Sequence, residues 1–353
     1  MLSVLRAALA AGEAERAWSL VAAVHPLLTA VDDHPYRLRL WQAGEAAARA
    51  LRDDRRRVRA LRWISHSYGI AGQVRQELPP AREALALAER LDDPGETAQT
   101  LRRLGEALRG QNQFDAAEAA LTRALRMFVE LGEVAEEIEV RAALGVLYNN
   151  FWRHEDSIPV LERARELLPA QETIIHGWVM LGLGLAYKFA GRRAESAELT
   201  DRAFGIARRL GNDFMLGYCF QERAWLVDQG GRYAEAERDF QEMLAIFERI
   251  RHGSGVGAAH EGLGVLAEKQ GRHEDALAHF DAAIDRYDRL GDRVRAGELR
   301  LRRSATRHAL GREAEAVHDR EEAERLIGDT PIRREPGLLA RLPVRPSTQP
   351  QAQ

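Results

Sequence analysis

The sequence HEGLGVLAEKQGRHEDALAHFDAAI, residues 260–284, contains two apolar runs that are separated by a glycine. The first run includes Leu263 and Leu266, and the second run includes Phe280. Apolar residues that recur three and four positions apart predict helices, and Gly271 between the two runs predicts a turn. The stretch therefore predicts a pair of helices packed against each other.

The same pattern recurs along the chain, for example from Arg102 and from Met180. Small residues in the middle of each first helix lie 40 residues apart, with one interval of 39. These markers are Ser65, Gly105, Gly145, Gly184, Ala224, Gly264 and Ser304. A constant period of this length indicates a helical repeat, and no long segment alternates as a strand does. We therefore expect an all-α chain.

This register resembles the tetratricopeptide repeat, whose consensus has a small residue, a glycine, an alanine and a large apolar residue at fixed positions. Gly264, Gly271, Ala276 and Phe280 occupy all four. The small residues have a steric reason, because the paired helices cross there and a large side chain would push the backbones apart. The resemblance spans about residues 58–327 and implies an α/α superhelix, a solenoid of antiparallel helix pairs.

A three-residue motif at the boundaries between repeats makes the resemblance more specific. It reads LGE at 131–133, LGN at 210–212 and LGD at 290–292. Together with RAWSLVAAVHPLL from Arg16, it resembles the C-terminal repeat region of actinobacterial transcriptional regulators of the Streptomyces antibiotic regulatory protein type and their NB-ARC NTPase relatives. The resemblance covers only that region. Their DNA-binding and ATPase functions therefore do not carry over.

Three parts of the chain are expected. They are an N-terminal helical capping segment, 1–57, seven tetratricopeptide-like helix pairs, 58–328, and a disordered proline-rich tail, 329–353. Proline is tolerated at a helix start but not inside a helix. We therefore expect breaks at Pro26 and at Asp32–Pro35, and a short second helix that begins at Pro79-Pro80.

Composition limits the kind of partner. With 51 basic and 54 acidic side chains, the formal net charge of −3 provides no global field to attract nucleic acid or a membrane. The single cysteine, Cys219, fits a reducing compartment, and the first residues match neither a signal peptide nor a spanning helix. We expect a cytoplasmic protein.

Three motifs suggest chemistry but have simpler explanations. GSGVGA at 253–258 fits a dinucleotide fingerprint, but no strand precedes it, so we interpret it as an inter-repeat turn. The pair His273 and His279 lacks the four-residue spacing of a zinc protease. Seven arginines between Arg49 and Arg62 predict a solvated turn rather than a nucleic-acid site. We expect no catalytic residue, cofactor or metal.

A partner site is expected on the concave face, because four positions of each first helix share one side. The expected residues are Arg62, His66, Arg102, Glu106, Arg109, Asn149, Trp178, Leu181, Leu185, Lys188, Tyr218, Gln221, Trp225, Asp228 and Glu261. Trp178, Tyr218 and Trp225 form its centre, although both tryptophans could instead pack between helices. The lysine and asparagine clamp of chaperone-binding relatives is absent.

The resemblance implies a non-catalytic, regulatory scaffold that binds a protein or peptide in this groove. Two alternatives remain open. The groove could sense a small signalling peptide or metabolite, or the solenoid could carry an enzyme pocket that no motif announces. Neither the partner nor the oligomeric state follows from the sequence.

Overall fold

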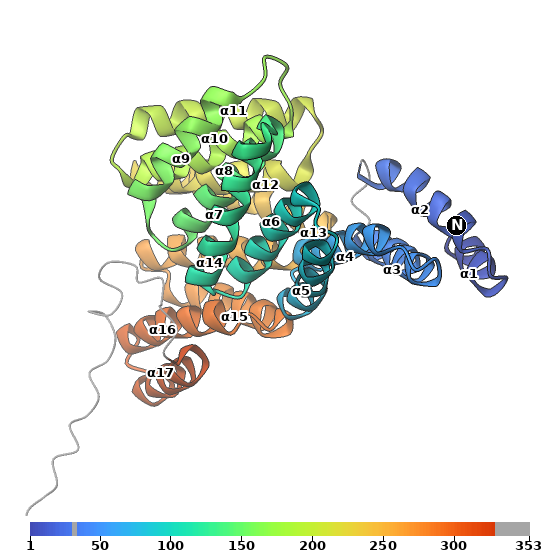
Figure 1. Cartoon of the computed structure of the whole chain (residues 1–353). Helices are drawn as coiled ribbons and strands as arrows, with labels where there is room; N and C mark the ends of the chain where they lie inside the picture. The colour runs from blue at the N-terminus through green and yellow to red at the C-terminus, as the bar shows by residue number, and fades with distance from the viewer. Residues whose placement is uncertain (30–33, 329–353) are drawn as a thin grey trace, which may run out of the picture. The chain divides into compact units, whose positions relative to one another are not determined.

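The computed structural model describes residues 1–29 and 34–328, and the expected tail 329–353 lies outside the described residues. Within these ranges every regular element is an α-helix, which confirms the all-α prediction (Figure 1). None of these helices combines the length and apolarity needed to cross a membrane. The helices are α1 Leu2–Ala10, α2 Ala14–Thr29, α3 His34–Ala50, α4 Asp54–Ile70, α5 Val74–Arg90, α6 Pro94–Gly110, α7 Phe114–Leu131, α8 Val134–Asn150, α9 His154–Leu167, α10 Ile174–Phe189, α11 Arg193–Arg209, α12 Asp213–Gln229, α13 Tyr233–Arg249, α14 Gly253–Lys269, α15 His273–Leu290, α16 Arg293–Ala309 and α17 Glu313–Ile327.

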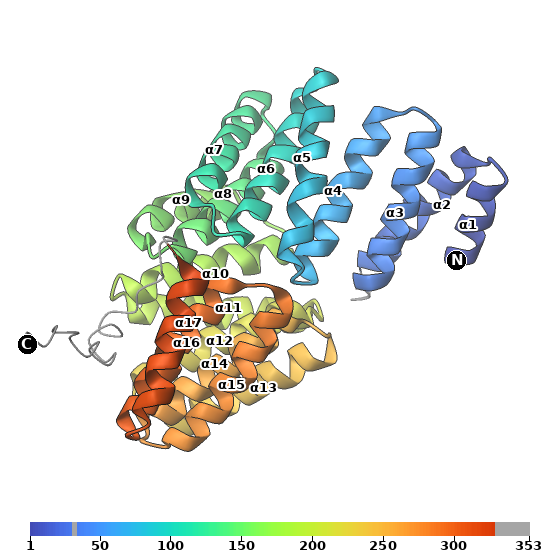
Figure 2. The same ribbon diagram turned by 90° about the horizontal axis from the view of Figure 1, so that it is seen from below.

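The chain forms two compact units, and the division falls inside α12. Unit 1 comprises Met1–Glu222 and Arg249–His252, and unit 2 comprises Arg223–Glu248 and Gly253–Gln353. In unit 1, α4 packs on α5, α6 on α7, α8 on α9 and α10 on α11 (Figure 2). In unit 2, α14 packs on α15 and α16 packs on α17. Consecutive helices therefore form the expected pairs within each unit.

The N-terminal helices follow the same period as the repeats. Helix α2 begins at residue 14 and α4 at residue 54, while α3 begins at 34 and α5 at 74. Helices α2 and α3 also pack on each other. They therefore have the form of a further helix pair, which α1 precedes.

Glycines in the first helices allow the close crossing of each pair. A Cβ atom at Gly264 would lie 2.6 Å from the Phe280 ring, and one at Gly105 would lie 2.5 Å from Cγ of Leu121. Real Cβ atoms do not approach other atoms this closely. The large residue sixteen positions later therefore packs directly on the glycine.

Serines that depart from the consensus form hydrogen bonds across the same crossing. The Ser196 hydroxyl donates to the carbonyl oxygen of Gly184 at 2.7 Å, and the Ser304 hydroxyl donates to that of Ala316 at 2.6 Å. Ser157 makes the equivalent bond. These side chains remain small enough for close packing and satisfy their own polar groups.

The boundary motif ends one helix and begins the next. Gly291 caps α15 with a φ of 73°, a left-handed conformation that glycine adopts without strain. The Asn212 side chain accepts a hydrogen bond from the Met215 backbone N–H at 2.7 Å, and Asp292 accepts one from Arg295 at 3.2 Å. Asn212 and Asp292 are therefore ordinary helix N-caps, whereas Glu133 begins α8 without a side-chain cap hydrogen bond.

The expectations for Pro26 and for Pro79-Pro80 were wrong, whereas the break expected at Asp32–Pro35 falls largely on residues 30–33, which lie outside the described residues. Pro79 and Pro80 lie inside the 17-residue helix α5, and α2 continues through Pro26. Each proline removes one helix hydrogen bond, but Leu78 and Ala81 beside them are buried in the core. Core packing therefore maintains α5 despite the two missing N–H groups.

The glycine run at 253–258 also differs from its expected role as a turn. It forms the first turns of α14. A Cβ atom at Gly257 would lie 2.9 Å from the Tyr287 ring, so this glycine provides room for packing between α14 and α15.

Candidate functional site

The first helices of the pairs in unit 1 form a continuous layer. Helix α4 contacts α6, α6 contacts α8, and α8 contacts α10. Over the described part of unit 1, the second helices α5, α7, α9 and α11 make no contacts of that extent with one another. The first helices are therefore closer together and lie on the concave side of this unit. We define the first-helix layer as α4, α6, α8, α10 and Asp213–Glu222 of α12.

Predicted site residues at the N-terminal end of the layer form ion pairs between neighbouring helices. The Arg62 guanidinium on α4 lies 3.3 Å from the Glu96 carboxylate on α6. Arg102 on α6 pairs with Glu106 in its own helix and with Glu139 on α8, both at 2.9 Å. Part of the predicted binding surface therefore connects successive repeats.

Two further predicted residues are buried in such contacts. The Asn149 side-chain amide donates to the backbone carbonyl of Gly182 on α10 at 2.8 Å. The Lys188 ammonium donates to the Glu222 carboxylate at 2.7 Å, and its side chain is only 4% exposed. Neither group is free to meet a ligand without breaking a helix-to-helix contact.

An aromatic cluster occupies the C-terminal end of the layer. The Trp178 ring on α10 lies 5.7 Å from Phe214 and 6.0 Å from Tyr218, both on α12, with edge-to-face geometry. His252 packs 4.9 Å from Phe214. Trp178 and Tyr218 are half-buried, whereas His252 is buried. The repeat register missed Phe214 and His252 because neither occupies a predicted concave position.

The predicted residues in unit 2 have different surroundings. Trp225 packs edge-on against the buried Phe240, with ring centres 5.0 Å apart. The buried Asp228 pairs with the ammonium of Lys269. Trp225 is itself half-buried and packs against the core of unit 2.

The remaining predicted residues differ in exposure. Leu181 is buried, while Leu185 and Gln221 are half-buried. Glu261 lies 3.7 Å from the Arg295 guanidinium. The side chains of His66 and Arg109 are half-buried.

Burial perturbs the charges at the N-terminal end of the layer. Burial lowers the pKa of Arg62 to about 10, although Glu96 opposes this shift. Burial raises the pKa of Glu77 on α5 to about 7, against the opposing effect of nearby arginines. Burial also opposes ionisation of Glu106, but Arg103 and Arg102 outweigh it and lower its pKa.

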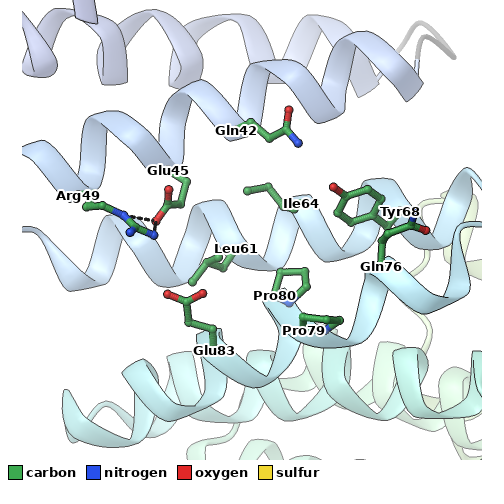
Figure 3. A pocket seen from close by; sticks show the side chains of 10 residues that line it. All are labelled: Gln42, Glu45, Arg49, Leu61, Ile64, Tyr68, Gln76, Pro79, Pro80 and Glu83. Carbon is green, nitrogen blue, oxygen red and sulfur yellow. Dashed lines mark hydrogen bonds and ion pairs between the residues drawn. The ribbon is translucent and has the colours of Figure 1, made fainter.

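A separate cavity of about 400 Å³ lies between α3, α4 and α5 (Figure 3). Leu61 and Ile64 of α4 contribute apolar surface to it, and the ion-paired Glu45 and Arg49 line it from α3. The full lining is Gln42, Glu45, Arg49, Leu61, Ile64, Tyr68, Gln76, Pro79, Pro80 and Glu83. Sequence reasoning missed this cavity because its walls come from three helices.

The other motifs are accounted for by local contacts. In the arginine run, Arg56 pairs with Glu15 at 2.6 Å and Arg57 pairs with Glu83 at 2.8 Å. Across residues 1–29 and 34–328, no group of three or more His, Cys, Asp or Glu side chains could hold a metal ion. Cys219 is buried.

Comparisons with known proteins support the repeat assignment. The profile of the tetratricopeptide repeat family matches residues 97–131, which comprise most of α6, the turn that follows it and the whole of α7. No curated protein matches the sequence. The fold is similar to that of a Rap protein solved in complex with competence and sporulation factor, with a TM-score of 0.62 and 12% identity over 96% of this chain and 98% of that chain.

Two other solved structures share the fold. The apo form of the quorum sensor NprR from B. thuringiensis has a TM-score of 0.60 and 12% identity, over 93% of this chain and 97% of that chain. A signal transduction ATPase with a tetratricopeptide repeat sensor, from Pyrococcus horikoshii, has a TM-score of 0.58 and 15% identity. The similarity covers 97% of this chain but 51% of the ATPase. At these identities the likeness shows a tetratricopeptide-type helical repeat fold.

Proposed function

We propose that this protein is a non-catalytic regulatory scaffold that binds a peptide, or a segment of a partner protein, along the first-helix layer of unit 1. The observation that carries the proposal is the half-buried aromatic cluster of Trp178, Phe214 and Tyr218 at one end of a concave layer. Aromatic side chains with one accessible edge are typical anchors for peptide side chains.

A signalling peptide is the form of partner that the fold comparisons favour. One similar protein was solved with competence and sporulation factor, and another is named as a quorum sensor. The ATPase of similar fold has its tetratricopeptide repeats as a sensor. We therefore propose a peptide-sensing module of a regulatory system, acting in the cytoplasm, and we keep the resemblance to antibiotic regulatory proteins as part of this proposal.

Co-purification tests this function. The full chain, isolated from its native cell, should carry peptides or partner proteins that mass spectrometry identifies after denaturation. A double variant, Trp178→Ala with Tyr218→Ala, should lose them while keeping its helical circular dichroism. Trp152→Ala is a matched control, because Trp152 is an exposed tryptophan at the α8–α9 turn, outside the layer. Ligands that remain bound to the folded double variant would contradict the proposed site.

A further inference from the structure

The aromatic cluster at the end of the first-helix layer consists of four rings with edge-to-face contacts. The ring centres of Phe214 and Tyr218 on α12 lie 5.2 Å apart. Both rings contact Trp178 of α10, at 5.7 and 6.0 Å, and both contact His252, at 4.9 and 6.3 Å. Trp178, Phe214 and Tyr218 are half-buried, whereas His252 is only 3% exposed. The buried His252 therefore contacts two of the three rings that are partly accessible to solvent.

The position of His252 in the repeat is one that normally serves helix capping. It directly precedes α14, as Asp53, Asn212 and Asp292 directly precede α4, α12 and α16. Those three side chains are half-buried, and each accepts a hydrogen bond from the backbone N–H three residues later. Histidine is not among the residues preferred at this position. A buried ring at a capping position indicates a role in the cluster, because local sequence rules are broken mostly at functional sites.

The segment that contains His252 is held against the start of α12. Arg249 forms an ion pair with Asp213, the first residue of α12, and the His252 ring packs on Phe214, the next residue. Residues Arg249–His252 belong to unit 1, although the chain before and after them belongs to unit 2. This short segment is thus part of the unit that contains the aromatic cluster.

The surroundings of the cluster favour an uncharged ligand group. Within residues 174–189 of α10 and 213–222 of α12, the Asp, Glu, Lys and Arg side chains are Asp213, Lys188 and Glu222. Asp213 pairs with Arg249, and Lys188 pairs with Glu222. Leu185 follows Trp178 by seven residues, so it lies on the same face of α10, and it is half-buried. The accessible surface beside the cluster is therefore mainly apolar.

We propose that His252 is a positioning residue of the peptide site. It holds Phe214 and Tyr218 so that, with Trp178, they form a pre-organised anchor for an apolar side chain of the bound peptide. This inference rests on the proposed function and adds the residue that orders the site and the chemistry of the group that the site accepts. Rings that are held in one arrangement before binding lose less conformational entropy on binding, so the peptide binds more tightly.

Two substitutions of His252 separate this role from a contribution to stability. His252→Asn removes the ring and introduces a preferred helix cap, like that of Asn212. The new cap should offset the lost ring contacts, so the melting temperature should stay within about 3 °C of the parent. His252→Phe keeps an aromatic ring and should preserve the cluster. Glu133→Asn is the matched control, because Glu133 directly precedes α8, is exposed and makes no side-chain cap hydrogen bond.

Fluorine NMR of the full chain labelled with 5-fluorotryptophan reports on the ring arrangement without any ligand. The chain contains six tryptophans, and the signal that disappears in Trp178→Phe belongs to Trp178. His252→Asn should broaden that signal or move it toward the position of free 5-fluorotryptophan, and it should leave the remaining tryptophan signals in place. His252→Phe and Glu133→Asn should keep the Trp178 signal single and narrow.

Fluorescence anisotropy with two labelled peptides measures the effect on binding. The apolar probe is a fluorescein-labelled heptapeptide amide with the sequence Gly-Ser-Leu-Trp-Leu-Ser-Gly, and the reference probe has serines in place of Leu-Trp-Leu. The parent should bind the apolar probe at least about tenfold more tightly than the reference probe, because an apolar side chain becomes buried. Salt should not change this preference, since no ion pair forms. His252→Asn should reduce the preference to less than about threefold, whereas His252→Phe and Glu133→Asn should keep it.

Three results would contradict the inference. An unchanged Trp178 signal or an unchanged probe preference in His252→Asn would overturn the positioning role. A melting temperature of His252→Asn far below that of the parent would make His252 a residue of the fold, with the same consequence. Equal affinity of the parent for the two probes would overturn the apolar anchor. In each case the proposed function would stand if Trp178→Ala with Tyr218→Ala removed the co-purified ligand, whereas retention of that ligand by the folded double variant would overturn both.

Discussion

Replacing Glu77 with glutamine should remove a pH dependence from the stability of the protein. The Glu77 carboxyl group is buried, and its pKa is raised from 4.5 to about 7. A raised pKa means that the folded state holds the proton more tightly than the unfolded state. The stabilisation from this proton is therefore complete below about pH 4.5 and is lost as the pH rises through 7.

The size of the effect follows from the shift. One pKa unit corresponds to about 1.4 kcal/mol, so full ionisation of Glu77 costs about 3 kcal/mol at pH 8. Between pH 5 and pH 8 the parent should lose about 2.5 kcal/mol of unfolding free energy relative to Glu77→Gln, whose side chain does not ionise.

Urea denaturation followed by circular dichroism at pH 5, 6, 7 and 8 measures this difference. Glu83→Gln is the control, because the Glu83 carboxylate lies on the same helix and is 47% exposed. A plot of its unfolding free energy against pH should run parallel to that of the parent. If the Glu77→Gln curve also runs parallel to the parent curve, the Glu77 carboxyl group is not protonated in the folded protein and the reasoning fails.

Three substitutions test the packing of the repeats, each by chemical denaturation. Gly264→Val should lower the unfolding free energy by about 1–3 kcal/mol or more, because the valine side chain would overlap the Phe280 ring that packs on this glycine. An unchanged unfolding free energy would contradict the close crossing of the two helices. Lys188→Met should lower the unfolding free energy by about 3–5 kcal/mol, because it leaves the buried Glu222 carboxylate without its cation. The double variant Lys188→Met with Glu222→Leu should recover much of this loss. Both Trp178 and Trp225 are half-buried, but only Trp225 packs on the buried core of unit 2, so Trp225→Ala should lower the unfolding free energy more than Trp178→Ala. Equal losses for the two tryptophans would mean that Trp178 is also a core residue.

The fold could be predicted because its determinants are local and repeated. Each pair needs a small residue, a turn and a large apolar residue at fixed spacing, and the contact between Gly264 and Phe280 shows the physical basis of that spacing. The same spacing did not identify the N-terminal pair formed by α2 and α3. His25 stands 40 residues before Ser65, where a small residue is expected, and the Trp41 indole N–H donates to its ring at 3.2 Å. A hydrogen-bonded aromatic pair replaces the small-residue contact there.

The prolines of α5 could not be placed from sequence for a related reason. A local rule weighs only the lost helix hydrogen bonds, about 3 kcal/mol or more for each interior proline. It does not include the burial of Leu78 and Ala81, which depends on the neighbouring helices. Tertiary packing therefore overrides the local preference at Pro79 and Pro80.

The candidate site was only partly predictable, because the register gives the face of a helix but not the partner of each side chain. Asn149 and Lys188 were expected to meet a ligand, yet each bonds to a group more than thirty residues away on the next first helix. The aromatic cluster also recruits Phe214 and His252 from outside the register. These contacts depend on how adjacent repeats pack on each other. The sequence pattern of a single repeat does not specify that packing.

Ion pairs along the layer show which of its charged side chains have a structural role. On α8, α10 and the first part of α12, each cation near the layer has a carboxylate or carbonyl partner, as the pair Lys188 and Glu222 illustrates. On α4 the arginines outnumber the carboxylates of the helix, but Arg55, Arg56 and Arg57 pair with carboxylates that lie outside it. Charged side chains such as Lys188 and Arg102 therefore connect neighbouring helices of the layer, so substituting them tests stability rather than contact with a ligand.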